Sequence, residues 1–307
     1  MARCFVTRQL PGTALDRLAE VHEVDVWPER LPPDPDELRR RTAGARGLLS
    51  MVTDRIDGEL FDGAPELEAV ANCAVGYDNI DVEAAREHGV AVGNTPGVLT
   101  GATADLTFAL LLSAARRLPQ SAASVLEGDW VTWEPGAHLG YDVHGATLGI
   151  VGRGRIGEAV ARRATGFDME VLVHSRSCGV SLDELLERSD FVSLHCPLTP
   201  ETRHLIDAGA LARMKPTAIL VNTARGPIVD PVALGRALHE GTIAGAALDV
   251  TDPEPLPADD PLLSAPNLLV VPHIGSASHA AREKMAELSV DNLLAALAGE
   301  PMPHAVT

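Results

Sequence analysis

The feature that most constrains the fold is a glycine-rich turn between a short apolar run and a helix-favouring run. Residues 147–157 read Thr-Leu-Gly-Ile-Val-Gly-Arg-Gly-Arg-Ile-Gly, and a helix-favouring stretch follows them. In a strand–turn–helix unit the first glycine permits the tight turn, the second lets the backbone approach a pyrophosphate, and the third lets the helix pack closely on the strand. The helix's first N–H groups then face the phosphates. The pattern predicts a dinucleotide site at Gly152, Gly154 and Gly157.

Composition narrows the class of protein. The chain has 307 residues, of which 46% are hydrophobic, so it is long enough for two domains with proper cores. Its 43 acidic and 25 basic residues give a net charge of −18, which argues against nucleic acid or a membrane surface as partner.

The start of the chain lacks the apolar run of a signal peptide, and residues 108–115, the longest apolar stretch, are too short to cross a bilayer. The four cysteines form no paired motif, which is typical of free thiols in a reducing compartment. We therefore expect a cytoplasmic protein.

Short apolar runs alternate with helical patterns along most of the chain, which predicts an α/β protein with parallel sheets. The expected strands are 2–7, 23–27, 47–52, 67–72, 90–92, 147–151, 170–174, 191–195, 218–222, 245–249 and 267–271. A long buried helix is expected from Thr100 to about Leu118, and a closing helix from 280 to 298 that ends at Gly299. Because the closing helix is expected to return to the first domain, we predict a discontinuous substrate domain of residues 1–97 plus 280–307, and a dinucleotide-binding domain of residues 98–279.

The end of the second strand of the dinucleotide unit bears on cofactor choice. In NAD-binding units an acidic residue there holds the ribose 2′-hydroxyl, but residues 174–177 are His-Ser-Arg-Ser. An arginine with hydroxyl neighbours suits a 2′-phosphate, because it forms charge-assisted hydrogen bonds. We predict a preference for NADP(H), with Arg176 as the main anchor and Ser175 beside it. The alternative is a solvated Arg176 and a ribose held by backbone groups, so NAD(H) stays possible.

Three charged or titratable residues follow successive strands near the end of the chain. Arg225, Glu254 and His273 each come after a predicted strand, where open α/β sheets build their sites. Together they suit reduction of a 2-oxo acid. Arg225 can bind the substrate's carboxylate and polarise the carbonyl, and His273 can protonate the carbonyl oxygen. Glu254 can orient the imidazole and favour its charged form. No spacing of histidine, cysteine and carboxylate indicates a metal.

Four further stretches carry a family resemblance. They are residues 75–81 (Val-Gly-Tyr-Asp-Asn-Ile-Asp), 93–100 (Gly-Asn-Thr-Pro-Gly-Val-Leu-Thr), 128–135 (Gly-Asp-Trp-Val-Thr-Trp-Glu-Pro) and 249–257 (Asp-Val-Thr-Asp-Pro-Glu-Pro-Leu-Pro). With the glycine turn, they make the chain resemble the D-2-hydroxyacid dehydrogenase family over nearly its whole length, most closely the glyoxylate/hydroxypyruvate reductase branch. The resemblance implies two Rossmann-like domains that close over a cleft. It also implies a homodimer, which we expect to form through the 100–145 region.

The resemblance also implies roles for individual residues. Arg225, Glu254 and His273 match the catalytic positions, with the histidine as acid and base. The backbone amides of Val75 and Gly76 match groups that bind the substrate carboxylate, and Ser276 matches a position near the substrate. The matches to cofactor contacts are Gly154, Arg155, Ile156, Cys196, Thr223, Asp249 and Gly275.

The sequence departs from the family pattern at three places. Arg153 stands where an apolar residue is usual, so the pyrophosphate loop is expected to be more exposed or more basic. Asp168 replaces a glycine, and aspartate tolerates the left-handed conformation better than most residues. The stretch from Arg176 to Ser181 is short, so the strand usual there is expected to be reduced or lost.

The sequence argues against two other enzyme classes and leaves two alternative functions. The chain has no Gly-x-Ser-x-Gly and no Gly-Lys pair, which argues against a serine hydrolase and a P-loop NTPase. The rival from another class is a nicotinamide-sensing binding module resembling the C-terminal binding protein corepressors. A dehydrogenase for another 2-hydroxy acid is the remaining alternative. Turnover of NADPH with a small 2-oxo acid would distinguish an enzyme from a binding module.

Overall fold

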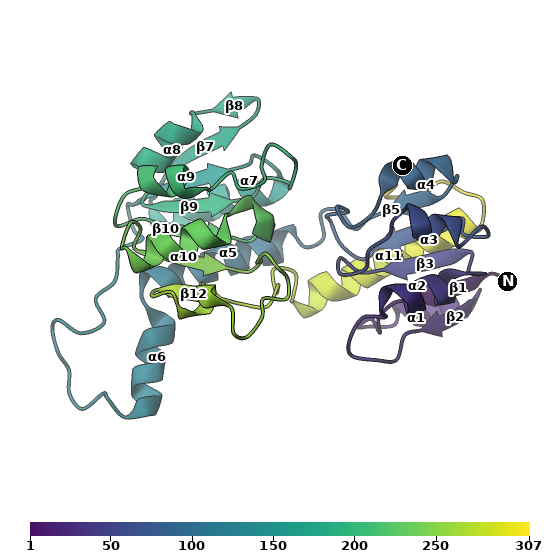
Figure 1. The fold of residues 1–307 in the computed structure, drawn as a ribbon, viewed down its shortest axis with the longest axis horizontal. Coiled ribbons are helices and arrows are strands. Elements are labelled where there is room, and N and C mark those ends of the chain that lie inside the picture. Colours follow the sequence, from purple (N-terminus) through teal and green to yellow (C-terminus); the bar gives the residue numbers. More distant parts are fainter. The chain divides into compact units, whose positions relative to one another are not determined.

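The computed structural model describes residues 1–307, which form two compact units (Figure 1). One unit consists of residues 1–99 together with 277–307, and the other of residues 100–276. The first unit is therefore made of two separate stretches of the chain. No helix in the structure combines the length and the apolar character that crossing a membrane requires.

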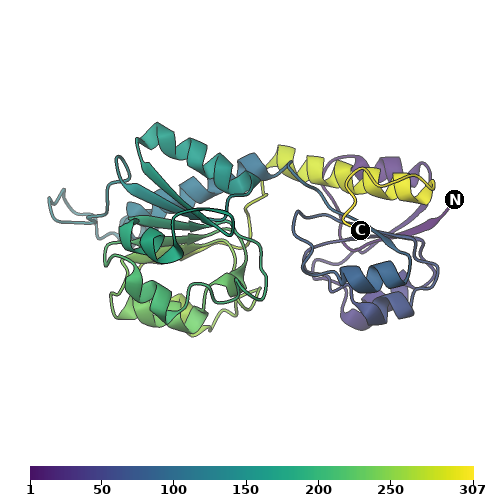
Figure 2. The same cartoon turned by 90° about the horizontal axis from the view of Figure 1, so that it is seen from above.

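The first unit is built on a five-stranded parallel sheet. Its strands are β1 (Arg3–Val6), β2 (Glu23–Val26), β3 (Gly47–Ser50), β4 (Ala69–Asn72) and β5 (Ala91–Gly93), and its helices are α1 (Ala14–Ala19), α2 (Pro35–Thr42), α3 (Gly58–Asp62), α4 (Val82–Glu87) and α11 (His279–Leu297). The strand order is β2-β1-β3-β4-β5, with every neighbouring pair parallel. Helices α1 and α11 lie on one face of this sheet and the other helices on the opposite face (Figure 2). The apolar positions of α2, α3 and α4 pack against the sheet around Phe5, Leu48 and Val70.

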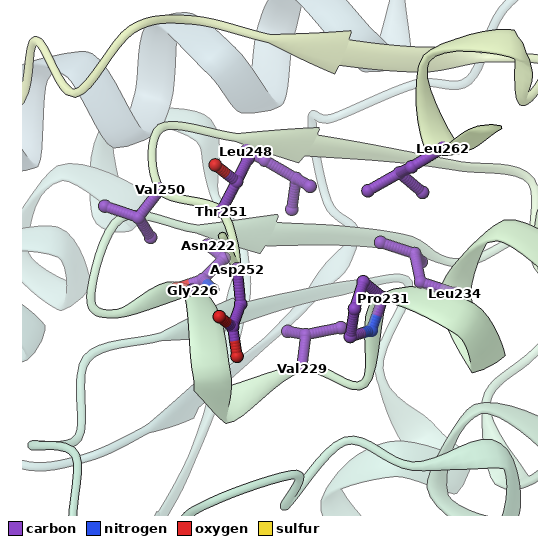
Figure 3. Close-up of a pocket in the computed structure, with 10 residues that line it drawn as sticks. All are labelled: Asn222, Gly226, Val229, Pro231, Leu234, Leu248, Val250, Thr251, Asp252 and Leu262. Carbon is purple, nitrogen blue, oxygen red and sulfur yellow. The ribbon is translucent and has the colours of Figure 1, made fainter. Parts of the chain in front are cut away.

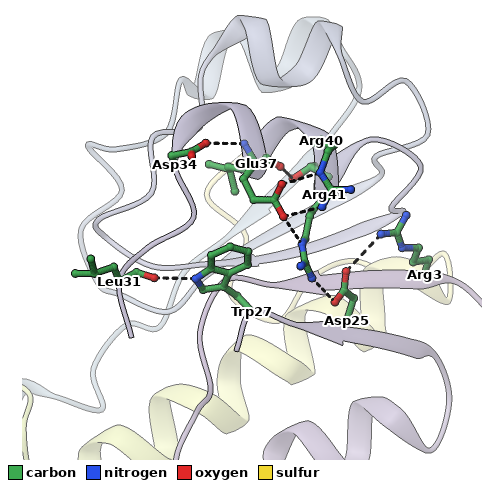
Figure 4. A network of polar contacts seen from close by, with 10 residues as sticks. Arg3, Asp25, Trp27, Leu31, Asp34, Glu37, Arg40 and Arg41 are labelled. Atoms are coloured by element: carbon green, nitrogen blue, oxygen red, sulfur yellow. Dashed lines mark hydrogen bonds and ion pairs between the residues drawn. The ribbon is translucent and has the colours of Figure 1, made fainter. Parts of the chain in front are cut away.

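An arginine-rich polar network holds α2 over the edge strand β2 (Figure 4). Arg41 donates to Asp25 at 2.8 Å and to Glu37 at 2.8 Å, and its guanidinium lies 4.9 Å from the ring centre of Trp27. Hydrogen bonds from Arg40 and Arg41 lower the pKa of Glu37 to about 2. These contacts join α2 to the edge strand β2 through the side chains of Arg41 and Asp25.

The second unit is built on a seven-stranded sheet. Its strands are β6 (Thr147–Val151), β7 (Glu170–Ser175), β8 (Cys178–Gly179), β9 (Phe191–Leu194), β10 (Ile219–Asn222), β11 (Gly245–Leu248) and β12 (Leu268–Val270). Its helices are α5 (Thr100–Ala115), α6 (Leu118–Glu127), α7 (Arg155–Ala164), α8 (Leu182–Arg188), α9 (Ala208–Arg213) and α10 (Pro231–His239), with 3-10 turns η1 (Thr165–Phe167), η2 (Gly226–Ile228) and η3 (Pro261–Ser264). The order is β12-β11-β10-β9-β6-β7-β8, and only the β7–β8 pair is antiparallel.

Both faces of the second sheet are covered, as a parallel sheet requires. Alternate residues of β10 show the division: Leu220 belongs to the core under α8, α9 and α10, whereas Ile219 and Val221 belong to the core under α5 and α7. Figure 1 shows α5 on the opposite side of the strands from α10. The α/β fold with parallel sheets in two units confirms the predicted fold class.

The region after α5 corrects one expectation. The helix expected to run to about Leu118 ends at Ala115, because Arg117 takes a left-handed conformation (φ 51°) and starts a new helix, α6, with Pro119 in its first turn. No side chain of α6 is buried, and α6 and the following loop extend away from the sheet (Figure 1). Helices α3 and α9, which have five and six residues, were not predicted from the sequence.

Two departures from the family pattern turn out as expected. Asp168 has φ 52°, so it occupies the left-handed turn in place of a glycine. The strand expected to be reduced is β8, which has only two residues and pairs with the end of β7. The closing helix α11 ends beside Gly299, which has φ 81° and so provides the expected left-handed cap.

Candidate active site

The glycine turn follows β6 at the point where the strand order reverses, between β6 and β9. Gly152 has φ 108°, and a Cβ there would lie 2.6 Å from backbone atoms of His195 and Cys196. A Cβ on Gly157 would lie 2.2 Å from the carbonyl oxygen of Gly152, so the turn packs on the helix through these two glycines. Gly154, by contrast, has nothing within 4 Å of such a Cβ. Its open side is where a phosphate can approach the backbone.

Gly154 is also the residue that caps the N-terminus of α7. It has no side chain to accept from the first-turn amides, and no side-chain cap is formed. Those amides, including that of Ile156, are left for a ligand, as in dinucleotide-binding units. Arg155 is the first helical residue, and Ile156 packs against the core under α5 and α7. The residues present therefore fit a bound dinucleotide.

The expected 2′-phosphate residues lie in the turn between β7 and β8. The hydroxyl of Ser175 donates to the Cys178 carbonyl at 3.0 Å, which fixes the turn that carries Arg176. The pKa of Glu201 is lowered by a hydrogen bond from Thr199 and, more weakly, by the positive charge of Arg176. Arg176 is exposed, and no acidic residue lies between residues 174 and 179.

Arg225 is positioned by a buried asparagine that sequence reasoning missed. Asn222, the last residue of β10, is fully buried, and its Nδ2 donates to the Arg225 carbonyl at 2.9 Å. Its Oδ1 accepts from the amide of Ala224 at 3.0 Å. The two hydrogen bonds of Asn222 stabilise the turn after β10 and so fix the position of the Arg225 backbone. An asparagine at a strand end is a recognisable signal for such a turn.

Glu254 and His273 meet as predicted. The imidazole Nδ1 of His273 forms a short hydrogen bond with the Glu254 carboxylate. The two side chains are 32% and 35% exposed, so both can be reached by a substrate. His273 has φ 51°, and its amide donates to the carbonyls of Asp249 (2.9 Å) and Val271 (3.0 Å). These two hydrogen bonds hold the backbone of His273 in a left-handed conformation, which histidine adopts more readily than most residues.

Asp249 anchors the loop that carries His273. Asp249 is 2% exposed, and its carboxylate accepts hydrogen bonds from the amides of Ile274 (2.6 Å) and Gly275 (2.8 Å). Burial raises the pKa of Asp249, an effect that these two hydrogen bonds and the nearby His273 oppose. A Cβ on Gly275 would lie 2.9 Å from the carboxylate, so the loop can approach only because this residue is glycine. Ser276 follows directly and is partly exposed.

Two buried threonines of α5 support the same loops from below. Thr107 hydrogen-bonds to Thr223 at 3.0 Å, and Thr103 donates to the Gly275 carbonyl at 3.1 Å. Both threonines are at most 4% exposed. The sequence pattern predicted a buried apolar helix here, and it gave no indication that two of its polar residues hold the turns after β10 and β12.

The turns after β10 and β11 are in direct backbone contact. A Cβ on Gly226 would lie 1.8 Å from the carbonyl oxygen of Thr251. The Thr251 hydroxyl donates to the Pro253 carbonyl at 2.8 Å, which bends the chain toward Glu254. Below this contact lies a small pocket between the two strand ends, lined mainly by apolar side chains such as Val229, Leu234 and Leu248 (Figure 3). It has room for about one water molecule and is no substrate site.

The turn after β9 contributes groups kept in their neutral forms. Burial raises the pKa of the Cys196 thiol to about 11. Burial also lowers the pKa of His195 to about 4, although its Nε2 shares a 2.8 Å hydrogen bond with Ser193. The His195 Nδ1 is buried without a hydrogen-bond partner. His195 lies beside Gly152, so its neutral form places no positive charge next to the glycine turn.

The buried His195 predicts a pH dependence of stability. The unfolded chain binds a proton near the ordinary pKa of 6.5, whereas the folded His195 does so only near 4. The unfolded state therefore binds more protons between these values, and the free energy of unfolding falls as pH is lowered from 6.5 to 4, by at most about 3 kcal/mol. Urea unfolding across this range should show a shallower pH slope for His195→Gln than for the wild type. Equal slopes would contradict this assignment, and exposed His239→Gln is the control.

Val75 and Gly76 belong to the first unit, in the loop after β4. Their carbonyl oxygens accept from the side chains of Asn94 and Asn72, each at 2.8 Å. The Asn79 side chain donates to the Met51 carbonyl at 3.1 Å, which ties this loop to the one after β3. With their carbonyls engaged, the Val75 and Gly76 amides make no hydrogen bond within the chain. The three asparagines were not singled out from the sequence as positioning residues.

Comparison with known proteins agrees with this geometry. Residues 108–275 match the family model for the NAD-binding domain of D-isomer-specific 2-hydroxyacid dehydrogenases. The glyoxylate reductase of Korarchaeum cryptofilum is 52% identical, over 99% of this chain and 95% of that protein. The crystal structure of the TT0316 protein from Thermus thermophilus superposes with a TM-score of 0.96 at 52% identity, covering 99% of this chain and 100% of the other.

A third relative is known with its cofactor. It is the NADPH-dependent glyoxylate/hydroxypyruvate reductase of Sinorhizobium meliloti, solved in complex with NADP and malonate, with a TM-score of 0.86 at 34% identity. The match covers all of this chain and 97% of that one. With the glycine turn, the Glu254–His273 pair and these matches established, the chain belongs to the D-isomer-specific 2-hydroxyacid dehydrogenase family of oxidoreductases.

Proposed function

We propose that this protein reduces a small 2-oxo acid, either glyoxylate to achiral glycolate or hydroxypyruvate to the D-2-hydroxy acid D-glycerate, and prefers NADPH as the cofactor. The observation that carries the proposal is the hydrogen-bonded Glu254–His273 pair, which follows β11 and β12 in the unit that also holds the glycine turn. Relatives named glyoxylate reductase, 52% and 49% identical over 99% of this chain, support the choice of substrate.

The roles of the three charged residues follow from their chemistry. Arg225 offers a planar fork of donors that suits the substrate's carboxylate and places the neighbouring carbonyl. Glu254 engages Nδ1 of His273, so Nε2 is the nitrogen that delivers a proton to the carbonyl oxygen. The same hydrogen bond holds the imidazole ring in a fixed orientation for that transfer. When bound, the reduced nicotinamide supplies the hydride to the carbonyl carbon, and hydride plus proton complete the alcohol.

Further substrate contacts are part of the proposal. The family resemblance implies that the amides of Val75 and Gly76 bind the substrate carboxylate. In support, asparagine side chains bind the carbonyl oxygens of these two residues, whereas their amides make no hydrogen bond within the chain. It places Ser276 near the substrate, next to the loop that Asp249 anchors. Steady-state kinetics with glyoxylate, hydroxypyruvate, pyruvate and phenylpyruvate test substrate choice. We expect glyoxylate and hydroxypyruvate to give the highest kcat/KM. A preference for a bulkier acid such as phenylpyruvate would show instead that the protein is a dehydrogenase for another 2-hydroxy acid.

The NADPH preference rests on the turn that carries Ser175 and Arg176. Comparing kcat/KM for NADPH and NADH tests it, in the wild type and in Arg176→Ala. We expect the wild type to prefer NADPH, and the variant to lose about 10- to 100-fold in kcat/KM with NADPH but little with NADH, because a charge-assisted hydrogen bond to the 2′-phosphate is lost. A wild-type preference for NADH would overturn this part of the proposal.

We also propose a homodimer formed through residues 100–145. Support comes from the exposed apolar side chains of this region: Leu118, Val125, Leu126, Trp130, Val131, Trp133, Leu139 and Tyr141. Such a concentration of apolar surface is typical of a protein interface. Sedimentation equilibrium should give twice the chain mass of 32.3 kDa, and Leu126→Asp should shift the equilibrium toward the monomer. A monomeric wild type would contradict the proposal.

The four free thiols support a cytoplasmic location.

A further inference from the structure

Arg153, the unexpected charge in the glycine turn, reaches across to the β7–β8 turn. Its Nη1 donates to the Cys178 Sγ at 3.4 Å, while its nearest carboxylate, Glu158, is 3.8 Å away. The side chain is 58% exposed. Arg153 therefore lies over the turn that carries Ser175 and Arg176, with a thiol as its main polar contact.

The β7–β8 turn is built so that its polar groups gather at one point. The Ser175 hydroxyl lies 3.1 Å from the Cys178 Sγ and accepts from the Cys178 amide at 3.2 Å. The turn closes tightly, since a Cβ on Gly179 would lie 1.8 Å from the Val173 carbonyl oxygen. Through Cys178 the Arg153 guanidinium and the Ser175 hydroxyl are thus in a single chain of contacts.

We propose that Arg153 is a specificity-determining residue that binds the 2′-phosphate of NADPH together with Ser175 and Arg176. This inference rests on the proposed NADPH preference and deepens it. In dinucleotide-binding units the ribose 2′ position lies between the glycine turn and the end of the second strand. Arg153 is the residue of the glycine turn that contacts the residues following that strand.

Two considerations of charge support the assignment. A thiol is a weak hydrogen-bond acceptor, so phosphate oxygens can replace Cys178 as the partner of Arg153 with a gain in interaction strength. The positive charge of Arg176 contributes, as the weakest of several causes, to lowering the pKa of the exposed Glu201. A phosphate dianion at this turn is then bound by two guanidinium groups in a protein whose net charge of −18 repels anions.

Binding of two adenosine nucleotides tests the inference without turnover. Calorimetric titration with 2′,5′-ADP and with 5′-AMP measures the contribution of the 2′-phosphate directly. We expect Arg153→Leu to weaken 2′,5′-ADP binding about 10- to 100-fold and to change 5′-AMP binding by less than about twofold. Arg153→Lys should fall between, because it keeps the charge but loses the fork. Arg162→Leu is the matched control, since Arg162 is an exposed arginine of α7, the helix that follows the glycine turn, and should leave both affinities unchanged.

The outcomes separate this inference from the proposal on which it rests. If the wild type binds 2′,5′-ADP no better than 5′-AMP, the NADPH preference is wrong and the role of Arg153 with it. If the wild type discriminates and Arg153→Leu discriminates equally well, only the role of Arg153 is overturned. Equal weakening of both nucleotides in Arg153→Leu would also overturn it, because it would show that Arg153 acts on the glycine turn and not on the 2′-phosphate.

Discussion

Replacing His273 by glutamine is expected to lower kcat for hydroxypyruvate reduction about 1,000-fold, because the reaction loses its proton donor. Glutamine can still donate a hydrogen bond to Glu254, so the loop after β12 should keep its place. Asp249 holds that loop independently through the amides of Ile274 and Gly275. NADPH binding, measured by the fluorescence of the bound nucleotide, should therefore change by less than about twofold.

The control for this variant is His239→Gln. His239 is an exposed histidine of α10 whose Nδ1 hydrogen-bonds only to a carbonyl of its own helix, that of Gly235 at 2.8 Å. Its replacement should leave kcat unaltered. A His273→Gln protein that turns over at the wild-type rate would show that another group, or water, protonates the carbonyl oxygen.

Arg225→Lys is the second change for which we expect a large effect, a loss of about 100- to 1,000-fold in kcat/KM for the 2-oxo acid. Lysine keeps the positive charge but cannot present two parallel donors to a carboxylate or reach the adjacent carbonyl with fixed geometry. Asn222 binds backbone atoms around residue 225, so the turn itself should persist in the variant. Binding of NADPH should again be retained.

Arg213→Lys serves as the control for Arg225→Lys. Arg213 is an arginine of α9 with a 3.3 Å surface ion pair to Asp183, and its change should leave kcat/KM within about twofold. If Arg225→Lys raised KM alone and kept kcat, Arg225 would bind ground state and transition state equally and would not polarise the carbonyl. Unchanged kcat and KM would remove Arg225 from the site.

The sequence predicted the fold class and the contact between Glu254 and His273 because the patterns that mark the strands are local. Short apolar runs marked all eleven longer strands to within a few residues. Parallel strands have their carboxyl ends at one edge of the sheet. Residues that follow neighbouring strands were therefore expected to lie close together, as Glu254 and His273 do. The glycine spacing was informative for the same reason: Gly152 and Gly157 are required by contacts within their own strand–turn–helix unit.

The positioning residues escaped prediction because their partners are distant in sequence. Thr103 and Thr107 contact Gly275 and Thr223, which lie more than 100 residues away, and no periodicity connects them. The break between α5 and α6 did carry a local signal, Pro119, but the apolar run before it suggested a continuous helix. Arg153 could be recognised as unusual, whereas its contact with Cys178 depends on the tight turn after β7.

The most direct test of the central claim is chiral analysis of the product formed from hydroxypyruvate and NADPH by the wild-type protein. A site in which Arg225 fixes the carboxylate and His273 protonates the carbonyl oxygen presents one face of the substrate to the hydride. We expect D-glycerate in an amount equal to that of the NADPH consumed. Formation of L-glycerate would contradict it, as would a protein that binds NADPH but reduces neither hydroxypyruvate nor glyoxylate.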